Sequence, residues 1–376
     1  MNEKEIAELR RRFRADKNAI PRVCGCYVNE EGRIVSRFDQ SFLLMPQEES
    51  EQLLGILRKT LSGTLGKNLL DISFDTRQVA DGAEHRLLMA LRDSSLQDEE
   101  AVQTLFQQIV RSLDLPGNYL ILLTCDTYDV PYRSKDGERQ DEASTEVFRY
   151  ILCSICPVKP TKAALSYYVD ERAFHALAAD WVLAAPEVGF LFPAFNERST
   201  DLYGALYYTK DTSQAHADFI ETLFRAPAPM PADEQQDTFQ TILGDTLAED
   251  CSYQAVRSVH ERLCGLIEEH KENKVEEPLT VSRDAMKRIL TDCGVEDRHI
   301  DAFEARYDAA FGAETDLSPR NIADTKQLEI ATQDVTVRVA PDRGDLVETR
   351  IIDGARYLLI RCESDVTVNG IPVQIK

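Results

Sequence analysis

Asn118-Tyr-Leu-Ile-Leu-Leu-Thr-Cys125 is the stretch that decides the fold, because it is the clearest buried strand in the chain. A second strand is predicted over residues 147–155, after a charged loop at about 126–142. No helical pattern lies between the two strands, whereas parallel strands need a crossover connection, usually a helix. The two strands are therefore predicted to pair antiparallel in a central sheet.

Further patterns before and after these two strands predict more strands and several helices. Residues 23–28 and 33–38 alternate across a turn that contains Gly32, which predicts a hairpin. Within residues 3–17, Ile6, Leu9 and Phe13 form one apolar stripe at helical spacing. Further strands are predicted over 71–74, 164–169, 188–192 and 202–208, and further helices over 50–61, 84–92, 98–112 and 213–224.

A proline-marked segment separates this body from the rest of the chain. Ala226-Pro-Ala-Pro-Met-Pro-Ala232 has prolines at alternate positions, as stiff linkers do. Helical patterns follow over 234–248, 252–271, 282–291 and 297–311, and short β segments begin at residue 328. We predict an α+β fold with a mixed or antiparallel-sheet body (1–225), a linker (226–232), an acidic helical segment (233–316) and a small all-β unit (317–376).

The charge of the chain is strongly negative and unevenly spread. The 376 residues carry a formal net charge of −22 at pH 7. Between Asp211 and Asp316 there are 24 acidic and 10 basic residues, whereas residues 1–40 contain 9 basic and 7 acidic residues. This charge predicts solubility and repulsion from phosphate backbones and anionic membranes, except where basic residues gather.

The composition excludes several classes of protein. Hydrophobic residues make up 43% and charged residues 29%, which is typical of a globular rather than a disordered chain. Apolar runs are too short to span a bilayer, and the first residues lack the apolar stretch of a signal peptide. The nine cysteines, an odd number, are expected to be reduced thiols. We expect a cytoplasmic protein without a membrane partner.

Two close cysteine pairs are candidates for metal binding, but their spacing favours packing in the core. Cys24 and Cys26 share one face of a predicted strand, whereas Cys153 and Cys156 fall on opposite faces of another. A structural zinc site needs about four ligands. The sequence also lacks the phosphate-loop, dinucleotide-binding and hydrolase-elbow motifs. We predict no bound metal and no cofactor.

The start of the chain is the one place where positive charge gathers. The candidate residues for binding a nucleic acid or another partner are Arg10, Arg11, Arg12, Arg14 and Arg22, with Lys17 beside them. Such a cluster binds phosphates or an acidic partner when it is exposed. The alternative is that these arginines form ion pairs with the acidic surface of the protein itself.

The charged loop after the first strand is the second candidate site. Its candidate residues are Asp126, Asp129, Tyr132, Arg133, Lys135 and Glu138. Paired carboxylates can hold a divalent metal ion that activates water, and loops on a rigid sheet often carry function. The alternative is an ordinary solvated loop.

Three segments carry a resemblance that covers nearly the whole chain: Leu65-Gly-Lys-Asn-Leu-Leu-Asp-Ile-Ser-Phe74, residues 122–133 and Asn369-Gly-Ile-Pro-Val373. They resemble an uncharacterised bacterial family, a domain of unknown function, which implies no activity. A second resemblance rests on residues 119–125, on Leu202-Tyr-Gly-Ala-Leu-Tyr-Tyr-Thr-Lys210 leading into Phe219, and on the β ending. These segments resemble the bacterial nucleoid-associated protein family, which implies a shared fold and contact with DNA.

The second resemblance departs from the family at the residues that would contact DNA. In that family the middle segment continues with several Arg and Lys residues, whereas here it continues as Asp211-Thr-Ser-Gln-Ala-His-Ala-Asp218. Lys210 is the only base in this segment. The basic contacts that the resemblance implies are therefore mostly absent here, whereas the shared fold is still expected.

Three functions remain open. The first is a non-enzymatic, nucleoid- or nucleic-acid-associated protein that binds through the N-terminal arginines. The second is a protein–protein interaction scaffold whose acidic segment 234–311 binds a basic partner. The third is a metal-dependent hydrolase that uses Asp126, Asp129 and Glu138. The sequence also leaves a homo-oligomer open.

Overall fold

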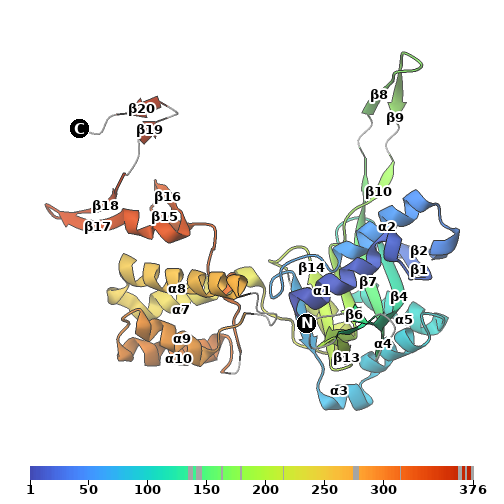
Figure 1. Ribbon diagram of the computed structural model, residues 1–376, viewed down its shortest axis with the longest axis horizontal. Coiled ribbons are helices and arrows are strands. Elements are labelled where there is room, and N and C mark those ends of the chain that lie inside the picture. Colours follow the sequence, from blue (N-terminus) through green and yellow to red (C-terminus); the bar gives the residue numbers. More distant parts are fainter. Residues whose placement is uncertain are drawn as a thin grey trace. The chain divides into compact units, whose positions relative to one another are not determined.

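The two strands at the centre of the predicted sheet pair as expected (Figure 1). Strand β4 (Tyr119–Val130) runs antiparallel to β7 (Glu146–Pro160), with Leu123 opposite Cys153. The prediction of an antiparallel pair is confirmed. The predicted end of the first strand is wrong, because β4 continues to Val130. Asp126, Tyr128 and Val130 keep the alternation of buried side chains, so the start of the predicted loop is strand.

The computed structural model describes residues 1–133, 139–140, 146–161, 164–177, 180–214, 216–273, 279–313, 315–362, 366–368 and 371–373. The chain divides into two compact units, of which the first holds Met1–Pro231 and the second begins at Ala232. The boundary falls at the end of the proline-rich segment, whose alternate prolines favour extended backbone over helix.

An eight-stranded sheet forms the centre of the first unit. Its order is β2-β1-β4-β7-β11-β14-β3, and β10 also pairs with β7. The remaining strands of the sheet are β1 (Arg22–Val28), β2 (Ile34–Ser41), β3 (Leu69–Ser73), β10 (Trp181–Leu183), β11 (Val188–Phe192) and β14 (Gly204–Thr209). Neighbouring strands pair antiparallel throughout.

Each face of the sheet buries a separate apolar layer. Helices α4 (Ala83–Asp93), α5 (Glu99–Ser112) and α6 (Ala217–Phe224) supply the apolar side chains on one face, and α3 (Thr76–Asp81) precedes them. Helices α1 (Glu3–Arg10) and α2 (Gln47–Lys59) supply those on the other, together with the hairpin of β12 (Ala194–Asn196) and β13 (Ser199–Asp201). Because side chains alternate along a strand, the strands of the sheet other than β10 contribute to both layers.

The N-terminal stripe and the cysteines follow this arrangement. Ile6, Leu9 and Phe13 are buried in the α1 layer, although the predicted single helix over 3–17 ends at Arg10 and continues as two short 3₁₀ turns. Cys24 and Cys26 lie in the α5 layer, whereas Cys153 and Cys156 lie in opposite layers, as predicted. Burial raises the pKa of the Cys24 and Cys26 thiols to about 12.

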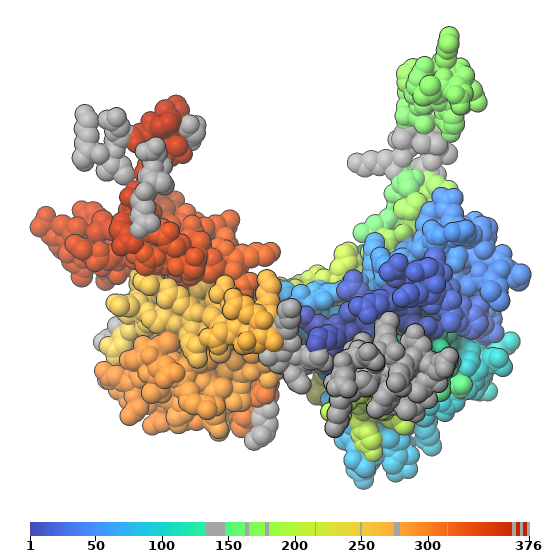
Figure 2. Space-filling model, viewed as in Figure 1, coloured from blue at the N-terminus to red at the C-terminus, as the bar shows by residue number. Residues whose placement is uncertain are grey.

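The second unit consists of helices followed by hairpins. Its helices are α7 (Ala232–Leu247), α8 (Tyr253–Glu272), α9 (Arg283–Asp292), α10 (Asp297–Ala310) and the short α11 (Pro319–Ile322). They pack against one another (Figure 2, yellow to orange) around Phe239, Leu263, Met286 and Phe303.

The chain ends in three separate two-stranded hairpins. They pair β15 (Leu328–Ala331) with β16 (Thr336–Val339), β17 (Val347–Ile352) with β18 (Ala355–Ile360), and β19 (Val366–Val368) with β20 (Ile371–Val373). The predicted fold class is confirmed: an antiparallel-sheet body, a helical middle and a small β-rich end.

Two further hairpins of the first unit lie outside the eight-stranded sheet. One pairs β5 (Tyr132–Arg133) with β6 (Arg139–Gln140), and the other pairs β8 (Ala164–Tyr168) with β9 (Ala173–Leu177). The sequence predicted β8 as a strand but not β9.

The substitution Phe148→Ala is expected to destabilise the first unit by about 3–5 kcal/mol. Phe148 is fully buried, and the centroid of its ring lies 4.9 Å from that of Tyr150 and 4.6 Å from that of Phe195. Its neighbour Val147 is 55% exposed, so Val147→Ala on the same strand is the matched control. Denaturant unfolding monitored by circular dichroism measures both. Equal losses from the two variants would contradict this assignment of the two faces of β7.

Candidate functional site

An ion pair joins the two sites predicted from the sequence. Arg12 forms a bidentate pair with Asp126: its Nε lies 2.9 Å from Oδ2 and its Nη2 lies 3.1 Å from Oδ1. The Tyr150 hydroxyl donates a second hydrogen bond to Oδ2 of Asp126, at 3.0 Å. The Asp126 side chain is 1% exposed and that of Arg12 is 18% exposed. Protein donors therefore occupy both oxygens of this carboxylate.

The pKa shifts of Arg12 and Tyr150 follow from burial and from the charge of Asp126. Burial alone would lower the pKa of Arg12, but the hydrogen bond and negative charge of Asp126 raise it above its ordinary value. Burial, followed by the charge of Asp126, raises the pKa of Tyr150 well above its ordinary value. Tyr150 thus remains a protonated donor, and the pair is a structural link between the N-terminal segment and β4.

The same link continues through Tyr128 to the β12–β13 turn. The guanidinium of Arg12 lies 5.0 Å from the centre of the Tyr128 ring, which is cation–π distance. The Tyr128 hydroxyl donates to Glu8 Oε1 at 2.6 Å, and Arg198 donates to the same carboxylate at 2.9 and 3.2 Å. The sequence analysis missed Glu8 and Arg198. In the sequence, only the spacing of four residues between Glu8 and Arg12 indicates that Glu8 belongs to this network.

The other four arginines of the candidate set differ from Arg12 in their partners and in their exposure. Arg22 donates to the backbone oxygen of Leu96 at 2.6 Å and pairs with Asp39 at 3.2 Å. Arg14 pairs with Asp16 at 3.0 Å, on the surface. Arg10 and Arg11 are exposed, and no acidic group of the described residues lies within ion-pairing distance of them. The alternative of pairing with the protein's own carboxylates therefore holds for Arg12, Arg14 and Arg22.

The loop candidates are not brought together either. Asp126 is buried on the α1 side of β4, whereas Asp129 is exposed and, at odd separation, points to the opposite face. Tyr132 and Arg133 lie in β5, where only the backbone is described. Lys135 and Glu138 lie outside the described residues. Asp126 and Asp129 therefore cannot ligate one metal ion, as the hydrolase hypothesis requires.

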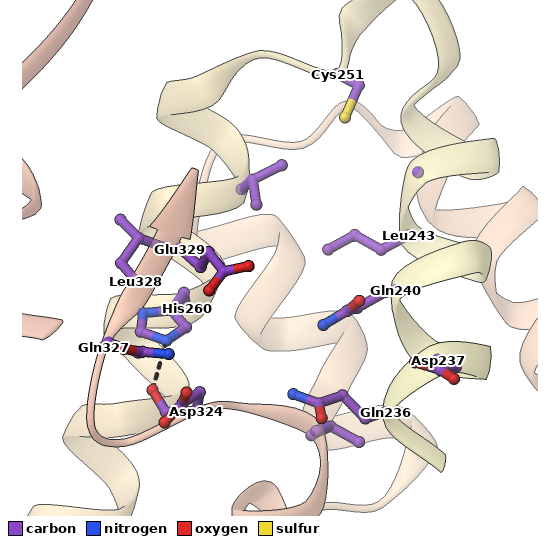
Figure 3. Close-up of a pocket in the computed structure, with 13 residues that line it drawn as sticks. Gln236, Asp237, Gln240, Leu243, Cys251, His260, Asp324, Gln327, Leu328 and Glu329 are labelled. Carbon is purple, nitrogen blue, oxygen red and sulfur yellow. Dashed lines mark hydrogen bonds between the residues drawn. The ribbon is translucent and has the colours of Figure 1, made fainter. Parts of the chain in front are cut away.

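The second unit contains a pocket of about 560 Å³ that the sequence analysis did not predict (Figure 3). Its walls come from α7, α8 and the segment that leads into β15. Gln240 and Leu243 extend from α7 towards Glu329 on the opposite wall (Figure 3). Its volume falls within the range of about 300–1,000 Å³ that is typical of ligand pockets.

Acidic and amide side chains dominate the polar lining of this pocket. Its carboxylates belong to Asp237, Asp324 and Glu329, and its amides to Gln236, Gln240 and Gln327. Among the described residues that line it there is no lysine or arginine. Arg338, on β16, donates to Glu329 Oε2 at 3.0 Å and is itself 65% exposed. Because so exposed an ion pair is weak, the lining keeps its negative character.

His260 lines the pocket, and Cys264 lies one turn further along the same face of α8, outside the lining. His260 Nε2 lies 2.8 Å from the backbone oxygen of Asp324, and the Cys264 sulfur lies 3.8 Å from the same nitrogen. Burial raises the pKa of Cys264 to about 11, so the group is a thiol at neutral pH, whereas nucleophilic catalysis needs the thiolate.

The substitution Asp126→Ala is expected to destabilise the first unit by about 3–5 kcal/mol, because it leaves the partly buried charge of Arg12 without its partner. The double variant Asp126→Leu with Arg12→Met is expected to recover most of that loss, since it removes both charges. Asp129→Ala, an exposed change on the same strand, is the control. Denaturant unfolding measures all three. A double variant no more stable than Asp126→Ala would refute the coupling.

The chain belongs to the family described as "Domain of unknown function (DUF4317)", whose model matches residues 1–371. This confirms the resemblance to an uncharacterised family. No curated protein and no solved structure matches the chain. Within the described residues, no helix has both the length and the apolar character needed to cross a bilayer.

Proposed function

We propose that this member of a family of unknown function is a non-enzymatic interaction protein whose second unit binds a basic segment of a partner protein. The observation that carries the proposal is the pocket, whose described lining holds three carboxylates and three amides but no lysine or arginine. A lysine or arginine side chain fits this lining, because carboxylate and amide oxygens accept the hydrogen bonds that a cation donates.

The charge of the chain supports the same partner. With a net charge of −22, the protein attracts a basic polypeptide over distance and speeds the encounter at low ionic strength. Leu243, Val256 and Ile322 add apolar surface to the pocket, against which the alkyl part of a long basic side chain packs. We place the interaction in the cytoplasm, since all nine cysteines are free and such thiols persist in a reducing compartment.

The double variant Asp237→Asn with Glu329→Gln is expected to weaken the binding of a lysine- and arginine-rich peptide about tenfold at low salt, equivalent to ~1.4 kcal/mol. It removes two charges from the lining and leaves Arg338 without its ion-pair partner. Fluorescence anisotropy of a labelled peptide measures the affinity, which is expected to fall as salt rises.

The matched control is Asp301→Asn with Glu268→Gln, which makes the same change in net charge at exposed positions of the second unit outside the pocket lining. This control is expected to change the affinity less than twofold, on the grounds that distant exposed charges are screened. Equal weakening by the two double variants would show that only net charge matters and would overturn the pocket as the site. Absence of peptide binding by the unmodified protein would overturn the proposal itself.

A second candidate function is association with nucleic acid, as in nucleoid-associated proteins. The specific observation in its favour is that Arg10 and Arg11 are exposed without an acidic partner among the described residues, with Arg14 and Lys17 exposed close by in the sequence. We rank it second because Arg12 and Arg22, which the hypothesis also needs, are engaged within the protein.

The variant Arg10→Gln with Arg11→Gln is expected to weaken the binding of double-stranded DNA at low salt, and to lower the slope of log affinity against log salt by about two. Filter binding or anisotropy with labelled DNA measures this. Arg33→Gln with Arg37→Gln on the β1–β2 hairpin is the control, with the same change in charge at other exposed arginines. If the unmodified protein does not bind DNA at low salt, this second function is excluded.

A further inference from the structure

The β8–β9 hairpin has one wholly apolar face that the described chain leaves uncovered. The register places Leu165 opposite Ala176 and Tyr167 opposite Phe174, so these four side chains share one face, here called the aromatic face. Tyr167 and Phe174 are neighbours, with ring centroids 5.0 Å apart. Leu165 is 69% exposed, Tyr167 50% and Phe174 68%.

The opposite face of the hairpin is different in character. Ser166 lies opposite His175, and Tyr168 lies opposite Ala173. His175 pairs with Glu171 at 2.8 Å, and its ring contacts that of Tyr168 edge-on, at 4.8 Å between centroids. This face is polar enough to stay in water. The hairpin is therefore amphipathic, as a strand pair is when one face packs against a second layer.

Within the described residues of the first unit, that second layer is missing. β8 and β9 pair only with each other (Figure 1), and no other described segment of this unit covers their atoms on the side shown in Figure 2. An isolated two-stranded hairpin is only marginally stable in water and gains independent stability by packing its apolar face. A partner packed on the aromatic face would therefore stabilise the hairpin.

We propose that this partner is the aromatic face of a second copy of the chain, so that two hairpins stack face to face in a symmetric dimer. The pattern is self-complementary, because a twofold axis through the face sets Tyr167 of one copy against Phe174 of the other. Formal charge does not oppose the contact locally, since Leu165, Tyr167, Phe174 and Ala176 are all uncharged.

The area of the face sets the strength of the dimer. With side chains half to two-thirds exposed, the aromatic face offers roughly 400 Å² per copy, hence roughly 800 Å² for two, if an aromatic side chain contributes about 150–250 Å² when fully exposed. Stable interfaces bury about 1,200–2,000 Å² in total. The dimer is therefore weak, because its interface is smaller than that of stable complexes and falls in the size range of transient contacts.

Salt distinguishes this contact from the binding of a basic partner. Two copies each carry a net charge of −22 and repel one another, and added salt screens that repulsion while leaving apolar burial intact. Dimerisation is therefore expected to strengthen as salt rises, whereas binding of a basic peptide weakens. Failure of one proposal leaves the other standing.

Sedimentation velocity over a series of protein concentrations, at about 0.05 M and 0.5 M NaCl, tests the dimer. The Debye length falls from roughly 14 Å to roughly 4 Å between these two conditions. Tyr167→Thr with Phe174→Thr is expected to weaken dimerisation at least tenfold while keeping residues of high β propensity. Tyr168→Thr, a change on the opposite face at a side chain 46% exposed, is the control and is expected to leave dimerisation unchanged.

Fluorescence provides a second measurement. Trp181 is the only tryptophan of the chain, lies in β10 close to β9 in the sequence, and is 58% exposed. Its emission is expected to shift to the blue with concentration in the unmodified protein and in Tyr168→Thr, but not in the double variant. An unmodified protein that stays monomeric at high concentration and high salt, or a double variant that dimerises as tightly as the unmodified protein, would overturn the proposal.

Discussion

The bidentate ion pair between Arg12 and Asp126 is the contact on which the first unit depends. It fastens the segment after α1 to the central strand β4, and the hydroxyl of Tyr150 completes the shell of the carboxylate. This ion pair occupies one cation of the N-terminal cluster and one carboxylate of the predicted loop. Each of the two sites predicted from the sequence therefore lacks one of its residues. The candidate binding pocket lies instead in the second unit.

The two units present surfaces of different chemical character. The first unit buries its charged network beside aromatic rings and presents the aromatic face of the β8–β9 hairpin. The second unit presents a pocket with carboxylate and amide lining. These surfaces respond to ionic strength in opposite directions, since apolar contact between like-charged copies gains from screening and attraction to a cation loses by it. On the two proposals made above, the second unit binds basic partners and the first unit couples copies of the chain weakly.

Much of the fold follows from local patterns in the sequence. Alternation identifies the β4–β7 pair and the β1–β2 hairpin, and apolar spacing identifies helices such as α2, α4, α5 and α8. Each feature that the sequence analysis predicted wrongly or missed has a physical reason. Asp126 reads as loop because a carboxylate is costly inside a strand unless a distant cation pairs with it. That cation, Arg12, is separated from it by most of the first half of the chain, and Arg198 is farther still from Glu8. The pocket escapes detection because its lining comes from three segments that share no motif.

The most direct test of the central claim is hydrogen–deuterium exchange of the intact protein with and without a lysine- and arginine-rich peptide. The account predicts slower exchange in α7 and in the segment 322–329, which form opposite walls of the pocket, and unchanged exchange in α1. Protection confined to regions outside the pocket, or no protection at peptide concentrations that saturate binding, would contradict it.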